Sequence, residues 1–173
     1  METRADYFAV DSAFSPQKDE ALAATFCLLC AMGRFYARNQ DMLTRNASRL
    51  LMLNRLACCL AVELEHSGLG IRYAPDLIHI DEQLNIGIRS RDGTGNLLAL
   101  ELTFTSGRPA MEHLHTLCCS GPVLQRYRLG IGMGLTRRDY RLEWISAEPE
   151  LNREMTEKYN VWSREAGFLN PVY

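Results

Sequence analysis

Alternating hydrophobic and polar positions predict β-strands between Asp76 and Ser106, and the other expected elements are arranged around this stretch. Leu84, Ile86 and Ile88 occupy every second position. After a glycine-containing loop at residues 91–96, a second run alternates in the same way, and its apolar side consists of Leu98, Leu100, Leu102 and Phe104. A period of two is typical of strands. We therefore expect an antiparallel meander that buries one face and leaves the other face available.

The segment from Leu129 to Trp144 alternates as well and predicts a β-hairpin. Its first strand presents Leu129, Ile131, Met133 and Leu135 on one side. The intervening positions 130, 132 and 134 are all glycine. Glycine weakens a strand and often marks the close approach of another backbone or helix. We therefore expect another element to pack closely on the glycine side of this hairpin.

Helical periodicity predicts four helices, and the first is apolar on nearly all sides. It is expected at Pro16–Arg38, where Ser15 can cap the helix and proline occupies the first helical position. A helix of this kind must be covered by other elements or by a partner chain. The other helices are expected at Thr44–His66 with Thr44 as the cap, at Pro109–Cys119, and at Pro149–Ala166. Smaller elements are expected at residues 70–74, as a strand, and 123–127, as a helical turn.

The expected order of elements is α–α–β–β–β–α–β–β–α. Strands come in clusters separated by helices, which is typical of the α+β class and not of a parallel βαβ series. We predict an antiparallel twisted sheet flanked by helices. The chain of 173 residues is long enough to bury a sizeable core. We divide it into an N-terminal extension at residues 1–43, which carries the apolar helix, and an α+β domain at residues 44–173.

Composition narrows the classes of function. The net charge of −2 does not favour a nucleic-acid binder, and 47% hydrophobic residues argue against disorder. The cysteine pairs lie inside apolar helical runs, so we expect reduced core thiols in a cytoplasmic protein: Cys27/Cys30, Cys58/Cys59 and Cys118/Cys119. The N-terminus METRADYF has no features of a signal peptide. The apolar run Leu22–Met32 is shorter than the ~20 residues that span a bilayer, so we expect no membrane insertion.

Two carboxylates suggest one catalytic alternative. Asp76 follows Pro75, and Glu101 lies in a later strand as Glu101-Leu102-Thr103. Carboxylates on neighbouring strands can hold Mg²⁺ or Mn²⁺ and activate water. By this pattern the stretch resembles the PD-(D/E)xK nuclease superfamily, although no lysine follows Glu101 before Lys158. We favour the simpler interpretation, in which Asp76 begins a strand and Glu101 lies on a solvated face.

A second resemblance covers residues 50–168. The helix LLMLNRLACCLAVELE is followed by the strand segments DLIHIDEQLNIGIRS and NLLALELTFTSG, a short helix, the hairpin LGIGMGLTRRDYRLEW and the closing helix ELNREMTEKYNVWSREAGF. In its order and pattern this region resembles the class I chaperones of bacterial type III secretion, the Tir chaperone family. The first residues of the chain, including the apolar helix, lie outside the resemblance.

The resemblance implies a binding protein and not an enzyme. Proteins of this family are cytoplasmic homodimers that bind the N-terminal segment of a secreted effector and keep it competent for export, without a cofactor. Carried over by position, the resemblance implies that effector binding involves the exposed members of one set: Leu84, Ile86, Ile88, Leu129, Ile131 and Met133. It implies a dimer interface at Met111, Leu114 and Leu117. Partners other than the effector and a second copy, such as nucleic acid or a membrane, are not expected.

Overall fold

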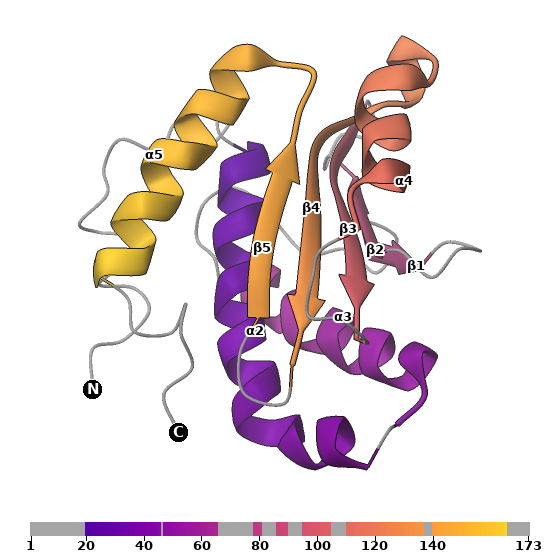
Figure 1. The fold of residues 1–173 in the computed structure, drawn as a ribbon, viewed down its shortest axis with the longest axis vertical. Coiled ribbons are helices and arrows are strands. Elements are labelled where there is room, and N and C mark those ends of the chain that lie inside the picture. The colour runs from indigo at the N-terminus through magenta and orange to yellow at the C-terminus, as the bar shows by residue number, and fades with distance from the viewer. Residues whose placement is uncertain are drawn as a thin grey trace.

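The computed structural model describes residues 20–45, 47–65, 78–80, 86–89, 95–104, 110–136 and 140–165 of the chain (Figure 1). The order of elements is α2 (Glu20–Thr44), α3 (Arg49–Glu65), β1 (Ile78–Ile80), β2 (Ile86–Arg89), β3 (Asn96–Thr103), α4 (Glu112–His115), β4 (Tyr127–Leu135), β5 (Tyr140–Ile145) and α5 (Pro149–Glu165). A π-helical turn at Thr116–Ser120 extends α4, and a 3-10 turn at Val123–Gln125 precedes β4. This order confirms the predicted α+β class.

The five strands form one sheet in the order β1-β2-β3-β4-β5. Neighbouring strands are antiparallel except for β3 and β4, which are parallel. The sheet is therefore mixed, and the prediction of a purely antiparallel sheet was wrong in this respect. A parallel pair needs a crossover connection, and α4 lies between β3 and β4 in the chain and packs on both of them.

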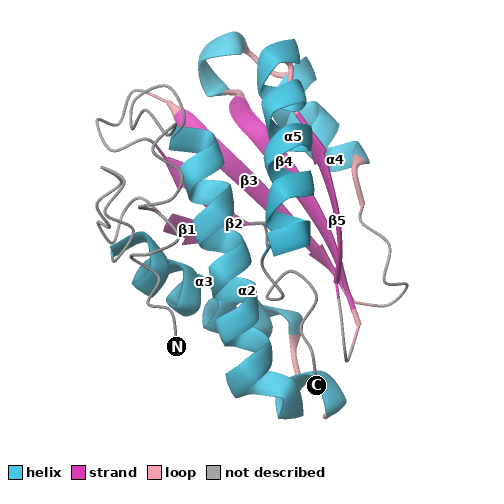
Figure 2. Cartoon of the chain, turned by 90° about the vertical axis from the view of Figure 1, so that its left-hand side faces the viewer, coloured by secondary structure: helices cyan, strands magenta, loops and turns pink. Residues whose placement is uncertain are grey.

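One face of the sheet carries the main hydrophobic core. The strand register aligns Leu98 with Leu129 and Leu100 with Ile131, so the apolar positions form continuous rows across the strands. Helices α2, α3 and α5 cover this face and contribute to the same core cluster, and Figure 2 shows α2 and α5 lying across the sheet. Because α2 belongs to this core, the N-terminal helix packs directly on the α+β domain.

Helix α2 extends beyond its predicted end. It continues to Thr44 through a kink at Asn39, whose φ and ψ angles of −128° and 23° are not helical. Thr44 is therefore the last residue of α2. The prediction that it caps the next helix was wrong. The cap of α3 is Ser48, whose Oγ accepts a hydrogen bond from the backbone N–H of Leu51 at 3.2 Å.

Other elements cover the apolar surface of α2, as expected for a helix of this composition. Its Phe26 ring packs edge-on against Trp162 of α5, with ring centroids 5.3 Å apart. Tyr36 stacks on Tyr140 of β5 at 5.9 Å and donates a hydrogen bond to the carbonyl of Thr136. By length and composition alone, the stretch Glu20–Leu43 could cross a membrane, but 72% of its most apolar window is buried inside the protein, as in a core helix.

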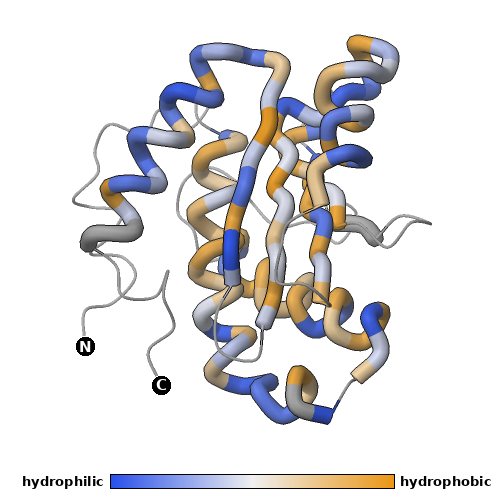
Figure 3. The backbone as a smooth tube through the Cα atoms, in the orientation of Figure 1, coloured by the Kyte–Doolittle hydropathy of each residue, from blue (hydrophilic) through white to orange (hydrophobic). Residues whose placement is uncertain are grey.

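The opposite face of the sheet carries α4 and its π-helical extension. A Cβ atom added to Gly130 would lie 2.8 Å from Cys118 Sγ and 3.3 Å from Leu114 Cβ. Leu114 and Cys118 are buried, and both belong to the helical segment that follows β3. The predicted close approach on the glycine side of the hairpin is therefore confirmed at Gly130. Figure 3 shows that hydrophobic positions along the strands alternate with less hydrophobic ones, including hydrophilic positions in β5.

Candidate functional site

The predicted effector-binding residues lie mainly in the core. Ile86, Ile88, Leu129, Ile131 and Met133 are all at most 1% exposed. Leu84 lies outside the described residues. Only exposed members of this set could contact an effector. None of the five described residues is exposed, so none of them can bind an effector in this structure. The physical reason is that their alternation turns them toward the face that α2, α3 and α5 cover.

The predicted dimer-interface residues are only partly accessible. Leu114 is fully buried against the sheet, so it cannot contribute to an interface without a rearrangement of α4. Met111 and Leu117 are half-buried. The most exposed apolar side chains nearby in the sequence are Val123 at 74% and Leu124 at 92%, in the 3-10 turn that follows the π-helical segment.

The acidic pair proposed as a metal site is not assembled within the described residues, because Asp76 lies outside them. Glu101 points toward α4, where its Oε2 is 3.5 Å from Nδ1 of His113. Its side chain is 16% exposed, so it does not lie on a fully solvated face. Among the residues that the structure describes, no three His, Cys, Asp or Glu side chains are grouped closely enough to hold a metal ion.

Strand β5 forms one edge of the sheet. It pairs with β4 along Gly130–Leu135, and no other described strand pairs with its outer side. Leu142 and Trp144 are half-buried, whereas Arg141 and Glu143 are exposed. Trp144 contacts Tyr159 of α5, with ring centroids 5.2 Å apart. An edge of this kind offers backbone donors and acceptors together with apolar side chains to an added strand.

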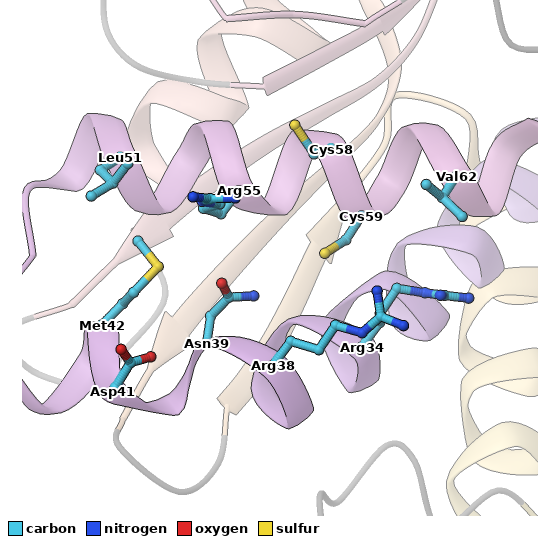
Figure 4. Close-up of a pocket in the computed structure, with 10 residues that line it drawn as sticks. All are labelled: Arg34, Arg38, Asn39, Asp41, Met42, Leu51, Arg55, Cys58, Cys59 and Val62. Atoms are coloured by element: carbon cyan, nitrogen blue, oxygen red, sulfur yellow. The ribbon is translucent and has the colours of Figure 1, made fainter.

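A groove of about 590 Å³ separates the second half of α2 from α3. Figure 4 shows that both helices supply its walls. Helix α2 contributes Arg34, Arg38, Asn39, Asp41 and Met42, and helix α3 contributes Leu51, Arg55, Cys58, Cys59 and Val62. The groove therefore combines three guanidinium groups with apolar and thiol side chains.

The three arginines differ in their partners. Arg34 donates from Nε and Nη2 to Oε1 of Glu63, at 3.0 and 2.8 Å. The Glu63 side chain is only 3% exposed, so this ion pair neutralises a buried carboxylate. Arg38 and Arg55 are exposed, and neither makes an ion pair with a residue that the structure describes. Their positive charge is therefore available to a ligand.

The two thiols of the groove lie in different environments. Cys58 is exposed and Cys59 is half-buried, and Figure 4 shows the Cys59 side chain directed toward α2. Burial raises the pKa of the Cys59 thiol, and the nearby Arg34 and Arg38 charges oppose that rise. None of the six cysteines, all of which lie in the described part of the chain, forms a disulfide, and only Cys27 and Cys118 are fully buried. The expectation that the thiols lie in the core therefore holds for part of the set.

Sequence reasoning missed this groove. A signal was present in α3, where Leu51, Arg55, Cys58 and Val62 recur at the spacing of one helical face. The partner residues on α2 could not be assigned, because the pairing of the two helices is a property of the fold. Comparisons of the chain with models of protein families, with curated proteins and with solved structures gave no match.

Proposed function

We propose that the chain is a non-catalytic protein-binding module that holds an extended segment of a client protein. This function is similar to that of the class I secretion chaperones that residues 50–168 resemble. If the chain acts as these chaperones do, the client is the N-terminal segment of a secreted effector, and a homodimer of the chain binds it. No cofactor is required by this function.

The observation that carries the proposal is the edge of the sheet at β5, whose outer side pairs with no other strand in the described part of the chain. A client segment could add to this edge as a further strand, with affinity from main-chain hydrogen bonds and selectivity from alternate side chains. Trp144 and Leu142 lie on alternate positions and are half-buried, so they are available to contact apolar residues of the added strand. The exposed Arg141 and Glu143 at the intervening positions would limit non-specific pairing at this edge, so that it accepts a segment with complementary side chains.

The homodimer is expected to use the exposed turn at Val123–Gln125. Leu124 is 92% exposed, and burial of such a side chain contributes about 1.5–3 kcal/mol. Light scattering should give the mass of a dimer for the native chain and that of a monomer for Leu124→Asp. A matched substitution on a different exposed leucine, Leu50→Asp, should leave the dimer intact. A native chain that is monomeric at all concentrations would contradict this part of the proposal.

Client binding is tested by capture followed by exchange measurements. The tagged chain is used to isolate bound proteins from a native lysate, and the bound segment is then synthesised in two forms. Hydrogen exchange at the backbone amides of β5 should slow when the normal segment is added. A segment with N-methylated backbone amides keeps its side chains but cannot form the strand ladder, so it should give little protection. Equal protection by both forms would refute strand addition.

The nuclease alternative is separated by a metal titration. Thermal unfolding is measured with and without Mn²⁺ for the native chain, Asp76→Ala and Glu101→Ala. The binding-module proposal predicts no metal-dependent shift in any of the three proteins. A large stabilisation by Mn²⁺ that both substitutions abolish would refute the proposal and establish a metal site.

A further inference from the structure

We propose that the groove between α2 and α3 is a second binding site, which accepts an acidic segment containing leucine or similar apolar residues from a partner protein. Arg38 and Arg55 would receive its carboxylates. The inference rests on the proposed function only in taking the occupant to be a protein segment. It is otherwise independent, because the groove and the β5 edge are built from different elements.

The charge of the groove favours an anionic occupant. Arg34 is neutralised by Glu63. Among the described lining residues, this leaves the positive charges of Arg38 and Arg55 against one acidic side chain, that of Asp41. This local excess of positive charge lies in a chain whose net charge is −2. Guanidinium groups bind carboxylates through paired hydrogen bonds with defined geometry. Both arginines are exposed, so an incoming carboxylate can reach them without breaking an ion pair within the described part of the chain.

The apolar part of the groove favours a protein segment over a small anion. Met42, Leu51 and Val62 line the same groove as the arginines. Leu51 is 46% exposed, and its neighbour Leu50 is 49% exposed. A small anion would contact only the arginines and leave these side chains in water. A segment that carries carboxylates and apolar side chains would satisfy both parts of the surface.

The ion pair of Arg34 with Glu63 holds one side of the groove in a defined position. Arg34 is held by two hydrogen bonds to Glu63, and the backbone of α3 around Glu63 accepts a contact from Cys27 of α2 at 3.8 Å. These contacts hold α2 and α3 together at the end of the groove near Glu63. Because the site is preformed, a bound segment would not have to order the helices that bind it.

The probe is a fluorescein-labelled peptide in which glutamate and leucine alternate, and binding is measured by fluorescence anisotropy. We expect the peptide to bind the native chain and to bind less well as salt is raised. The double variant Arg38→Glu/Arg55→Glu should weaken binding about tenfold or more. Arg89→Glu reverses an exposed charge on β2 and should leave the affinity unchanged. The milder variant Arg38→Gln/Arg55→Gln should also weaken binding. It provides a second test in case the double charge reversal does not fold.

Alkylation by N-ethylmaleimide locates the bound peptide. Cys58 lines the groove, whereas Cys119 lies in the π-helical turn next to α4. The peptide should slow alkylation at Cys58, as measured by peptide mass spectrometry, and leave the rate at Cys119 unchanged. Equal binding by both double variants and the native chain would overturn the inference. So would equal binding of a lysine–leucine peptide, or equal protection of Cys58 by citrate, which would indicate a small-anion site.

The proposal of strand addition at β5 and the inference about the groove can be refuted independently. Amide exchange in β5 is measured with the captured client in the Arg38→Glu/Arg55→Glu variant. If the groove test fails while β5 is still protected, only the inference about the groove is wrong. If β5 is never protected while the acidic peptide binds the groove, the strand-addition proposal is wrong and the groove stands.

Discussion

The substitution Gly130→Ala tests how closely the helical segment after β3 packs on the sheet. The added Cβ would lie 2.8 Å from Cys118 Sγ, 3.1 Å from Ile145 Cγ2 and 3.3 Å from Leu114 Cβ. The first distance is shorter than real Cβ contacts, so at least the Cys118 side chain must move. Leu114 Cβ is fixed to its backbone, so it can give way only if α4 shifts.

Two opposing effects determine how much Gly130→Ala changes the free energy of unfolding. Adding a methyl group to a well-packed interior costs about 1–3 kcal/mol. Replacing glycine also restricts the unfolded chain, which stabilises the protein by about 0.4–1 kcal/mol. We expect a net loss of about 1–2 kcal/mol in the free energy of unfolding. For a chain of this size, that lowers the melting temperature by roughly 2–8 °C.

The assay is urea unfolding followed by tryptophan fluorescence, with Gly95→Ala as the matched control. A Cβ atom at Gly95 would meet no atom of the described residues within 4 Å, so this variant should be as stable as the native chain or slightly more stable. Cys118→Ala removes the nearest obstructing atom. The double variant Gly130→Ala/Cys118→Ala should therefore lose less stability than the sum of its two single variants. Additive losses, or a stable Gly130→Ala protein, would refute the packing described for α4.

Three further predictions concern the interior and the helix ends. Arg34→Ala removes the guanidinium that pairs with the buried Glu63 carboxylate, so it should lower the free energy of unfolding in urea by about 3 kcal/mol. The added change Glu63→Leu should recover most of that loss, and a loss below about 1 kcal/mol for Arg34→Ala would contradict the assigned ion pair. Burial raises the pKa of the Cys118 thiol from 9.0 to about 12. Above pH 9 the thiol therefore ionises in the unfolded chain before it does so in the folded protein, and the free energy of unfolding should fall as the pH rises toward 12. The Cys118→Ala variant should lack this part of the fall, and identical pH profiles for the two proteins would show that Cys118 does not cause it. Ser48→Ala removes the cap of α3 and should cost about 0.5–2 kcal/mol, measured by thermal unfolding; an unchanged melting temperature would exclude that cap.

Local patterns in the sequence predicted most of the elements because each depends on nearby residues. The alternation at residues 129–144 gave the hairpin of β4 and β5 with its apolar side. Proline at position 149 and the periodicity after it gave α5, which ends at Glu165. The glycine at position 130 predicted a close contact before its partner was known, since the absence of a side chain is itself a local signal.

The direction of β4 and the location of the site depend on long-range packing, so the sequence did not reveal them. Alternation identifies an apolar face but does not say whether helices cover it, and Ile131 proved to be core for that reason. The end of α2 was also misplaced, because the chain continues through a kink at Asn39 that no residue pattern marks. The groove needs Arg38 and Arg55 from two helices, and only the folded pairing of those helices brings them together.

The position of α2 has a consequence for how the chain is made. Tyr36 in α2 donates its hydrogen bond to Thr136, a hundred residues later, and Phe26 packs on Trp162 in α5. A ribosome adding about 5–20 residues per second needs roughly 5–20 s to supply partners at that distance. During that interval α2, whose apolar surface is buried in the folded protein, emerges without the residues that cover it, so the nascent chain would itself be a substrate for general folding factors. The core can therefore close only after α5 has left the ribosome.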